Sequence, residues 1–365
     1  MRASPPDHGP LPFTQRTGWL IRSVAVLMCV ALAPVVIGSL PQEDRRAAYA
    51  SVPTRAGPFA YHYAQMVEET TPVDLLIVGQ STLWNALDTP MIQDALTVAW
   101  ERPAVARTLG FSWEGPDLIH VLTKDMVSRR EVRAVLIQAP KRWQTRNAPH
   151  PYTNRLVRPN EEHDYGFDAL PLELRATWCS ARALATPIHL LNRVRTPADR
   201  WVEEDPLRDF TLDLPRELGS SAREIGFLGA PFIEGRPPSP TAPVERWIHT
   251  ECSDEGTLSD YARHFYGLLG RTCADRGIPI IVLDIPDYGE SDRVAPSFVA
   301  DWPQLLGGEV HLVGLPGAEL FAGIGPEERE RIFFDYHFNR NGSEWFTEAL
   351  IPALLEILDA DGDDR

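Results

Sequence analysis

A serine and a histidine near opposite ends of this chain have the surroundings that acyl chemistry requires. Ser81 follows the apolar run at residues 73–78 and the turn residues Gly79 and Gln80. Such a run is typical of a buried strand, and ligands of an open α/β sheet bind beyond the carboxyl ends of its strands. A serine held there faces the crevice in which a nucleophile has to lie. The alternative is that Ser81 only caps the helix that follows.

The second candidate group is His337, in the segment 333–342 before the last expected helix. In an extended segment, residues two apart point to the same side, so Asp335 and His337 should project together. A carboxylate that orients a histidine and stabilises its cation is what serine activation needs. The alternative is a surface loop with an incidental Asp-x-His. Leu83 replaces the second glycine of Gly-x-Ser-x-Gly, which argues against the nucleophile elbow of α/β-hydrolases.

Strand and helix patterns alternate between these two sites, which predicts an α/β fold with a doubly wound parallel sheet. Residues 141–256 lose this periodicity and are rich in proline, so we expect a long, loop-rich insertion over the carboxyl edge of the sheet. The expected strands are 73–78, 104–109, 134–138, 279–285 and 309–313, and the expected helices are 90–100, 116–129, 172–185, 258–275 and 344–358.

The N-terminal part contains a segment long enough to cross a membrane. Residues 23–40 carry no charge, and roughly 20 apolar residues span a bilayer. Arginines precede the segment while the charges after it cancel, which places residues 1–22 in the cytoplasm and the rest outside. We favour an uncleaved transmembrane anchor, a connecting segment at 41–70 and a folded domain at 71–365. The alternatives are a signal peptide cleaved near Ala48-Tyr49-Ala50, or a core helix.

Charge and cysteine content exclude some function classes. The formal net charge of −16 over 365 residues argues against a nucleic-acid partner. The four cysteines form no Cys-x-x-Cys pair, so neither a zinc site nor a redox site is expected, and no cofactor is implied. Cys29 lies in the apolar segment. Two of Cys179, Cys252 and Cys273 could pair if the domain is exported.

Two motifs together resemble the SGNH (GDSL-like) hydrolase superfamily. They are Gly79-Gln80-Ser81 after the first strand and Asp335-x-His337-x-Asn339-x-x-Gly342 before the final helix. The match looks closest to the membrane-anchored SGNH hydrolase-like proteins and the alginate-type O-acetyltransferases. The resemblance spans about residues 73–358, with its motifs at the two ends. The family usually has aspartate where Gln80 stands, and many members space the aspartate and the histidine by three residues rather than two.

This resemblance implies a flavodoxin-like sheet and a Ser-His-Asp triad that transfers acyl groups in two steps. Ser81 would be the nucleophile, His337 the base and Asp335 the group that orients it. The backbone N–H groups of Ser81 and Gly110 would bind the oxyanion. The family's Gly-x-Asn block is missing after the third strand, and Gln138 stands near that place as a substitute donor.

The implied function is that of an acyl esterase or an O-acyltransferase, with acetyl the expected group, acting on a cell-envelope polysaccharide. The domain would lie in the periplasm, tethered to the inner membrane. Its partners would be a carbohydrate or acylated small molecule, the lipid bilayer and proteins of polysaccharide biosynthesis. The alternative is a catalytically inactive scaffold or glycan-binding protein with the same fold, which the missing asparagine and Gln80 favour.

Overall fold

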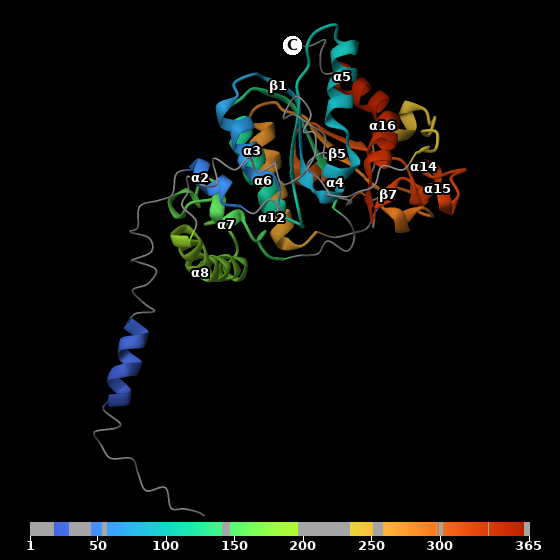
Figure 1. Ribbon diagram of the computed structural model, residues 1–365. Coiled ribbons are helices and arrows are strands. Elements are labelled where there is room, and N and C mark those ends of the chain that lie inside the picture. Colours follow the sequence, from blue (N-terminus) through green and yellow to red (C-terminus); the bar gives the residue numbers. More distant parts are fainter. Residues whose placement is uncertain are drawn as a thin grey trace, which may run out of the picture.

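The computed structural model describes residues 18–28, 45–52, 57–140, 147–195, 234–250, 258–296, 298, 302–334 and 336–360. Its centre is a six-stranded sheet in the order β2-β1-β3-β5-β6-β4 (Figure 1). β4 pairs with β6 in the antiparallel sense, and the other pairs are parallel. The strands are β1 (Val73–Gln80), β2 (Ala106–Phe111), β3 (Val132–Gln138), β4 (Ile248–His249), β5 (Ile280–Leu283) and β6 (Val310–Val313). The expected α/β class with a mostly parallel sheet is therefore confirmed, and the strand order is compatible with a flavodoxin-like fold.

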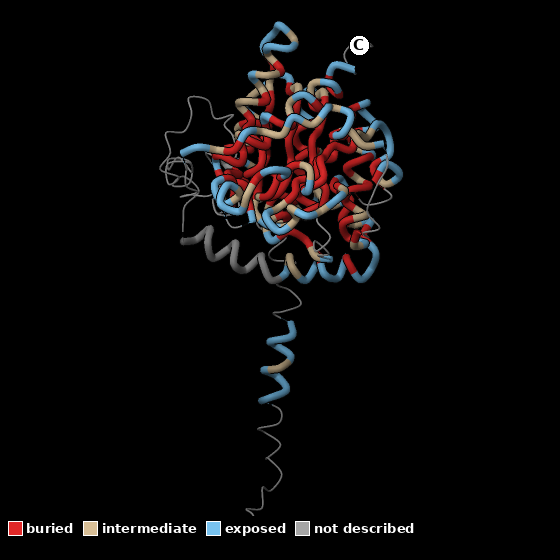
Figure 2. Tube along the Cα trace, turned by 90° about the vertical axis from the view of Figure 1, so that its right-hand side faces the viewer, coloured by how far each residue is buried: buried red, intermediate tan, exposed pale blue. Residues whose placement is uncertain are grey.

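Helices cover both faces of this sheet and bury two apolar layers (Figures 1 and 2). Leu76 and Val78 of β1 belong to one layer and Ile77 to the other, as the twofold period of a strand requires. The first layer is closed by α6 (Pro116–Val127), α12 (Asp260–Ala274) and α13 (Trp302–Leu306). The second is closed by α4 (Ser81–Ala86), α5 (Thr89–Ala99) and α16 (Arg340–Ala360).

Shorter elements decorate the edges of the sheet. A hairpin of β7 (Phe333–Phe334) and β8 (His337–Phe338) precedes α16. The described part of the insertion holds α7 (Thr153–Leu156), η3 (Pro159–Glu161), α8 (Leu172–Arg195) and α11 (Val244–Trp247). The remaining turns are η5 (Tyr288–Glu290), α14 (Gly317–Leu320) and α15 (Pro326–Glu330).

The segment expected to cross a membrane is only partly described. Residues 18–28 are helical, and Val24, Val26 and Leu27 are exposed. Residues 29–44 lie outside the described residues. Within the described part of the chain, no helix combines the length and the apolar character needed to cross a bilayer.

The segment expected only to connect anchor and domain is packed into the domain. It forms α2 (Arg45–Ala50), α3 (Phe59–Tyr63) and η2 (Ala64–Glu68), and Tyr49 and Phe59 are both buried in the first apolar layer. The chain therefore enters the folded unit at α2, about 25 residues earlier than residue 71.

Of the cysteines considered for a disulfide, Cys179 and Cys273 are both free, the first exposed and the second buried. Burial raises the pKa of the Cys273 thiol to about 12. Cys29 and Cys252 lie outside the described residues.

Two glycines of α12 allow a matched test of how closely this helix packs against α13. A Cβ on Gly270 would lie 1.8 Å from the Leu306 carbonyl oxygen, whereas one on Gly267 would meet nothing closer than 3.7 Å. We expect Gly270→Ala to lower the free energy of unfolding by roughly 1–3 kcal/mol. Gly267→Ala should raise it by about 0.5–1 kcal/mol, because alanine loses less entropy than glycine on entering a helix. Urea unfolding measures both variants, and equal effects would contradict the close α12–α13 contact.

Candidate active site

Ser81 and His337 meet at the carboxyl edge of the sheet. Ser81 is the first residue of α4, directly after β1, and His337 is the first residue of β8. The distance between Ser81 Oγ and His337 Nε2 is 2.9 Å, which is within hydrogen-bond range. His337 is buried, whereas Ser81 is partly exposed. The structure thus brings together two groups that lie 256 residues apart in the sequence.

The first turn of α4 holds Ser81 in place. Its N-cap residue, Gln80, makes no capping side-chain bond. Instead, Gln138 Oε1 at the end of β3 accepts the Leu83 N–H at 3.2 Å, and Asn85 Nδ2 donates to the Ser81 carbonyl oxygen at 2.7 Å. A Cβ on Gly79 would lie 2.5 Å from Leu83 Cδ2, so glycine there leaves room for the Leu83 side chain against the end of the strand. A helix does follow Ser81, as the alternative interpretation held, but the hydroxyl of Ser81 is directed to His337.

Asn339 anchors the hairpin that carries His337. Its Nδ2 donates to the carbonyl oxygens of Arg331 at 3.0 Å and Phe333 at 3.3 Å, and its Oδ1 accepts the Gly342 N–H at 3.0 Å. A Cβ on Gly342 would lie 2.0 Å from the Ile332 carbonyl oxygen. Asn339 and Gly342 therefore hold the hairpin against the start of α16. The sequence had shown them only as positions of a motif.

The position of Asp335 is not described. Asp335 was expected beside His337 on the assumption of one extended segment, whereas Phe334 pairs with His337 across an antiparallel hairpin. That geometric reason no longer applies, because a hairpin reverses the chain between the two strands. The role of Asp335 as the group that orients His337 stays a prediction.

Gly110 lies within β2, opposite Gly79 of β1, rather than after the strand. A Cβ there would lie 2.4 Å from Cγ of Trp84, so glycine lets the α4 indole pack on the strand. The Gly110 carbonyl oxygen is 2.7 Å from His62 Nε2. Burial lowers the pKa of His62 to about 4, so the neutral ring donates this bond at pH 7. The contacts give Gly110 a packing role, and its role as an oxyanion donor stays a prediction.

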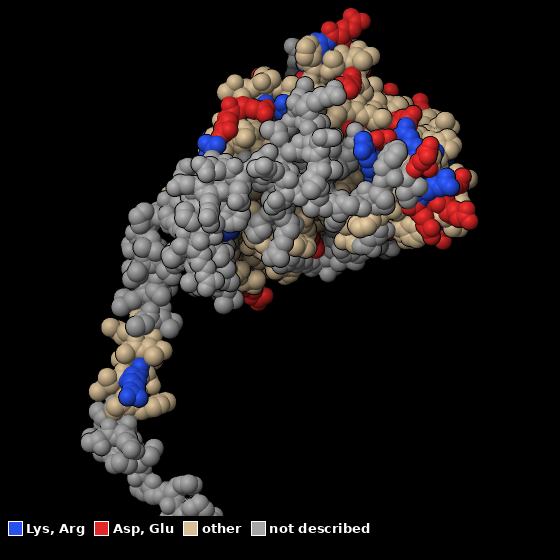
Figure 3. Space-filling model, viewed as in Figure 1, with Lys and Arg blue, Asp and Glu red and all other residues tan. Residues whose placement is uncertain are grey.

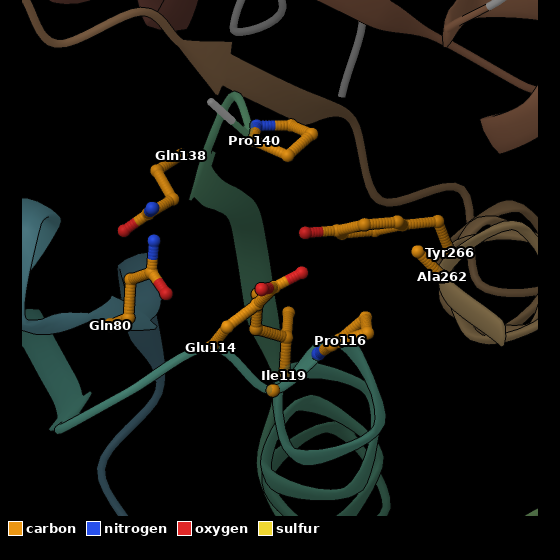
Figure 4. Close-up of a pocket in the computed structure, with 9 residues that line it drawn as sticks. Gln80, Glu114, Pro116, Ile119, Gln138, Pro140, Ala262 and Tyr266 are labelled. Atoms are coloured by element: carbon orange, nitrogen blue, oxygen red, sulfur yellow. The ribbon is translucent and has the colours of Figure 1, made fainter. Parts of the chain in front are cut away.

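A pocket adjoins the serine on the side of α6 and α12. It is small, with a volume of about 10 Å³, which is room for about one water molecule. It is lined by Gln80, Gln138, Glu114, Tyr266 and smaller or apolar neighbours, among them Pro140 after β3 and Ile119 of α6. The Gln80 and Gln138 amides face one another at its rim, and the Glu114 carboxylate and the Tyr266 hydroxyl point inward (Figure 4). Sequence analysis missed Glu114 and Tyr266, since they come from a loop and a helix that carry no motif.

A buried carboxyl group secures the loops beside this pocket. Asp117, in the first turn of α6, is fully buried and accepts the His150 backbone N–H with both oxygens, at 3.2 and 3.0 Å. The His150 ring nitrogen Nε2 is 2.8 Å from the Ser112 carbonyl oxygen. Asp117 therefore ties the start of the insertion to the loop that follows β2.

This carboxyl group should make stability depend on pH. Burial raises the pKa of Asp117 from 3.8 to about 6, so the folded protein binds more protons than the unfolded chain between those values. Its contribution to stability is greatest below pH 4 and is lost as the pH rises through 6. From pH 4 to pH 7, Asp117→Asn should gain up to about 3 kcal/mol in free energy of unfolding relative to the wild type. Urea unfolding at both pH values measures this, and parallel pH profiles would contradict it.

Comparison with protein-family models, with curated proteins and with solved structures gives no match for this chain. Among the described residues, no group of three or more His, Cys, Asp or Glu is placed to hold a metal ion.

Proposed function

We propose that this chain is a serine acyl esterase or O-acyltransferase with the SGNH hydrolase fold, acting on a glycan of the cell envelope. The observation that carries the proposal is the 2.9 Å distance between Ser81 Oγ and His337 Nε2 at the carboxyl edge of a doubly wound sheet. The strand order and the placement of the serine after β1 and the histidine before the last helix also support it.

The chemistry would proceed in two steps. His337 Nε2 takes the proton of the Ser81 hydroxyl as Oγ forms a bond to the ester carbonyl carbon. The carbonyl oxygen becomes an oxyanion, for which the Ser81 N–H, the Gly110 N–H and the Gln138 amide are the proposed donors. When the ester C–O bond breaks, His337 gives its proton to the departing alkoxide. Water or a sugar hydroxyl then attacks the acyl-serine with His337 again as the base. The bond between the acyl carbon and Ser81 Oγ breaks, and Oγ takes the proton back from His337. Attack by water makes the protein an esterase, and attack by a sugar hydroxyl makes it a transferase.

The proposed location is the periplasmic side of the inner membrane, with residues 23–40 as an uncleaved anchor. Cleavage after Ala50 would remove Arg45 and Tyr49, which are built into the folded domain. This packing favours the uncleaved anchor over the signal peptide.

A second candidate function is that of a non-catalytic glycan-binding protein. The amide oxygen of Gln138 accepts the Leu83 N–H, so this side chain caps α4. This bond restrains the Gln138 amide and hinders it from turning to donate to an oxyanion. A site with one oxyanion donor fewer loses roughly a hundredfold or more in rate.

A fluorophosphonate probe decides between the two functions. The probe phosphonylates an activated serine, so we expect the detergent-solubilised full chain to be labelled at Ser81, as located by peptide mass mapping. Labelling should vanish in Ser81→Ala and His337→Ala. A wild-type chain that stays unlabelled while a serine esterase in the same tube reacts would refute the catalytic proposal and favour the binding protein.

A further inference from the structure

The ring of Tyr336 lies directly against the imidazole of His337. The two ring centroids are 4.0 Å apart, and the ring planes are inclined by 36°. Aromatic pairs usually have centroids about 4.5–7 Å apart. A separation below this range leaves no room for an edge-to-face arrangement, so the rings meet largely through their faces. Tyr336 is 45% exposed whereas His337 is buried, so the phenol ring also covers part of the imidazole from solvent.

The turn of the hairpin makes this contact possible. Neighbouring side chains of a continuous strand point to opposite faces, so a Tyr-His pair within one strand would not meet. Tyr336 lies in the turn between β7 and β8, and Phe334 pairs with His337 across that turn. The reversal of the chain lets the Tyr336 ring fold back onto the ring of the next residue. Asn339 holds the hairpin against the start of α16, which braces the contact.

The imidazole that Tyr336 contacts belongs to the candidate base. Its Nε2 atom lies 2.9 Å from Ser81 Oγ. In the proposed mechanism the proton moves from Oγ to Nε2, and the imidazole becomes a cation. A cation within about 6 Å of an aromatic face is attracted by the ring electrons, more strongly where water is excluded. The Tyr336 ring is therefore placed to stabilise this cation and to limit rotation of the imidazole away from Ser81.

The charged groups around His337 come from α16 and from the turn. β8 packs against α4, β7 and α16, and neither α4 nor β7 contains an ionisable side chain. At the start of α16, Arg340 and Glu344 lie 3.9 Å apart and offset one another. Around β7 and α15, on the right-hand side of the view, acidic and basic side chains are interspersed (Figure 3). Asp335 lies outside the described residues, so a test has to keep this expected orienting carboxylate constant.

We propose that Tyr336 is a positioning residue of this site: its ring holds the His337 imidazole toward Ser81 and stabilises the imidazolium that forms when His337 takes the serine proton. The proposal rests on the proposed function in treating His337 as the base. It assigns an aromatic partner to this base in addition to the carboxylate expected from Asp335.

The first test measures the imidazole directly, without turnover. NMR titration of the detergent-solubilised full chain, with carbon-13 at Cε1 of its histidines, gives the titration midpoint of His337, whose signal is the one missing in His337→Ala. Tyr336→Leu keeps an apolar side chain but has no aromatic face. Its His337 midpoint should fall by about half a pH unit, because the imidazolium loses its ring partner. Tyr336→Phe, which keeps the aromatic face, should restore the wild-type midpoint.

Tyr288 supplies a matched control. It is also a tyrosine, is 39% exposed, and packs its ring on the same hairpin, 5.6 Å from the ring of Phe333. Tyr288→Leu should leave the His337 midpoint unchanged. If Tyr336 only shields the imidazole from water, a smaller side chain should raise the midpoint, because burial disfavours the charged form. An unchanged or raised midpoint in Tyr336→Leu, or an equal fall in Tyr288→Leu, would overturn the proposal.

Ester hydrolysis keeps this proposal separable from the proposed function. With p-nitrophenyl acetate at a pH above the midpoint, Tyr336→Leu should lower kcat/KM by about two- to fivefold, and Tyr336→Phe should restore it. Full activity in Tyr336→Leu would reject the positioning role. A lowered midpoint in a chain that hydrolyses no ester and takes no fluorophosphonate label would uphold the effect of the ring on the imidazolium and reject catalysis.

Discussion

Ser81→Ala and His337→Ala should each lower the hydrolysis of p-nitrophenyl acetate by about a thousandfold or more. In the proposed mechanism the two side chains, 2.9 Å apart, act as one unit, because the imidazole removes the proton that the attacking oxygen must lose. In a serine hydrolase, loss of either member of this pair removes nearly all of the catalytic gain. Initial rates measured on the purified full chain, with the uncatalysed hydrolysis of the ester as the reference rate, test this expectation.

The pair should also behave non-additively. If Ser81 and His337 act as a unit, the double variant Ser81→Ala/His337→Ala should be no slower than the worse single variant. His163→Ala is the control, since His163 bonds the Asp168 carboxylate but its side chain is 87% exposed. That variant should keep the wild-type rate. Activity that persists in Ser81→Ala would show that another group does the chemistry.

Much of the fold can be predicted from the sequence because its central strands are continuous apolar runs. β1 and β3 have interior residues buried on both faces, which makes each of them read as an unbroken stretch of Leu, Ile and Val. α12 keeps one polar face and ends near Gly277, and its bounds agree with the expected 258–275 to within two residues. By contrast, α8 ends at Arg195 rather than at 185, and α16 begins at Arg340 rather than at 344. The local sequence pattern predicts a strand or a helix well where the burial of each face stays the same along the segment.

The parts that could not be predicted depend on contacts between distant segments. α4 has no capping side chain of its own, and its cap comes from Gln138 on another strand. Asn339 bonds backbone groups of Arg331 and Phe333 that reach it only once the hairpin has formed. A single sequence shows which residues can make such bonds but not which backbone groups they will face.

The same limit explains why residues 41–70 were expected to be a connecting segment. α2 has six residues, too few to show a helical period, and the sequence predicted only a short helix near residues 61–69, close to α3 and η2. They are ordered by packing, since Tyr49 and Phe59 fill the layer against α6 and the sheet. The Ser81–His337 contact was predictable for a different reason: both groups follow from the rule that functional residues gather at the carboxyl ends of parallel strands.

A buried polar cluster joins α2 to the domain. Asp125 of α6 accepts bonds from Arg45 at 2.5 Å, from the Tyr49 hydroxyl at 2.5 Å and from the Tyr165 hydroxyl. Arg45 also bonds Glu161 at 3.1 Å. Burial raises the pKa of both tyrosines, and the Asp125 carboxylate raises it further, so both phenols remain neutral donors. One carboxylate thus satisfies three donors from α2 and the insertion.

Asp125→Ala should lower the free energy of unfolding by about 3–5 kcal/mol, because it leaves the Arg45 guanidinium buried without its main partner. The melting temperature should fall by roughly 10 °C. The exposed pair Arg246–Glu319 is the control, and Glu319→Ala should cost no more than about 1 kcal/mol.

Replacing both charges of a buried pair by apolar groups destabilises a protein less than removing one charge and leaving the other unpaired. The double variant Arg45→Met/Asp125→Leu should therefore recover much of the free energy of unfolding that Asp125→Ala loses. Urea unfolding followed by tryptophan fluorescence measures all four proteins. A double variant less stable than Asp125→Ala would contradict this, because it would mean that Arg45 stabilises the fold mainly through partners other than Asp125, such as Glu161.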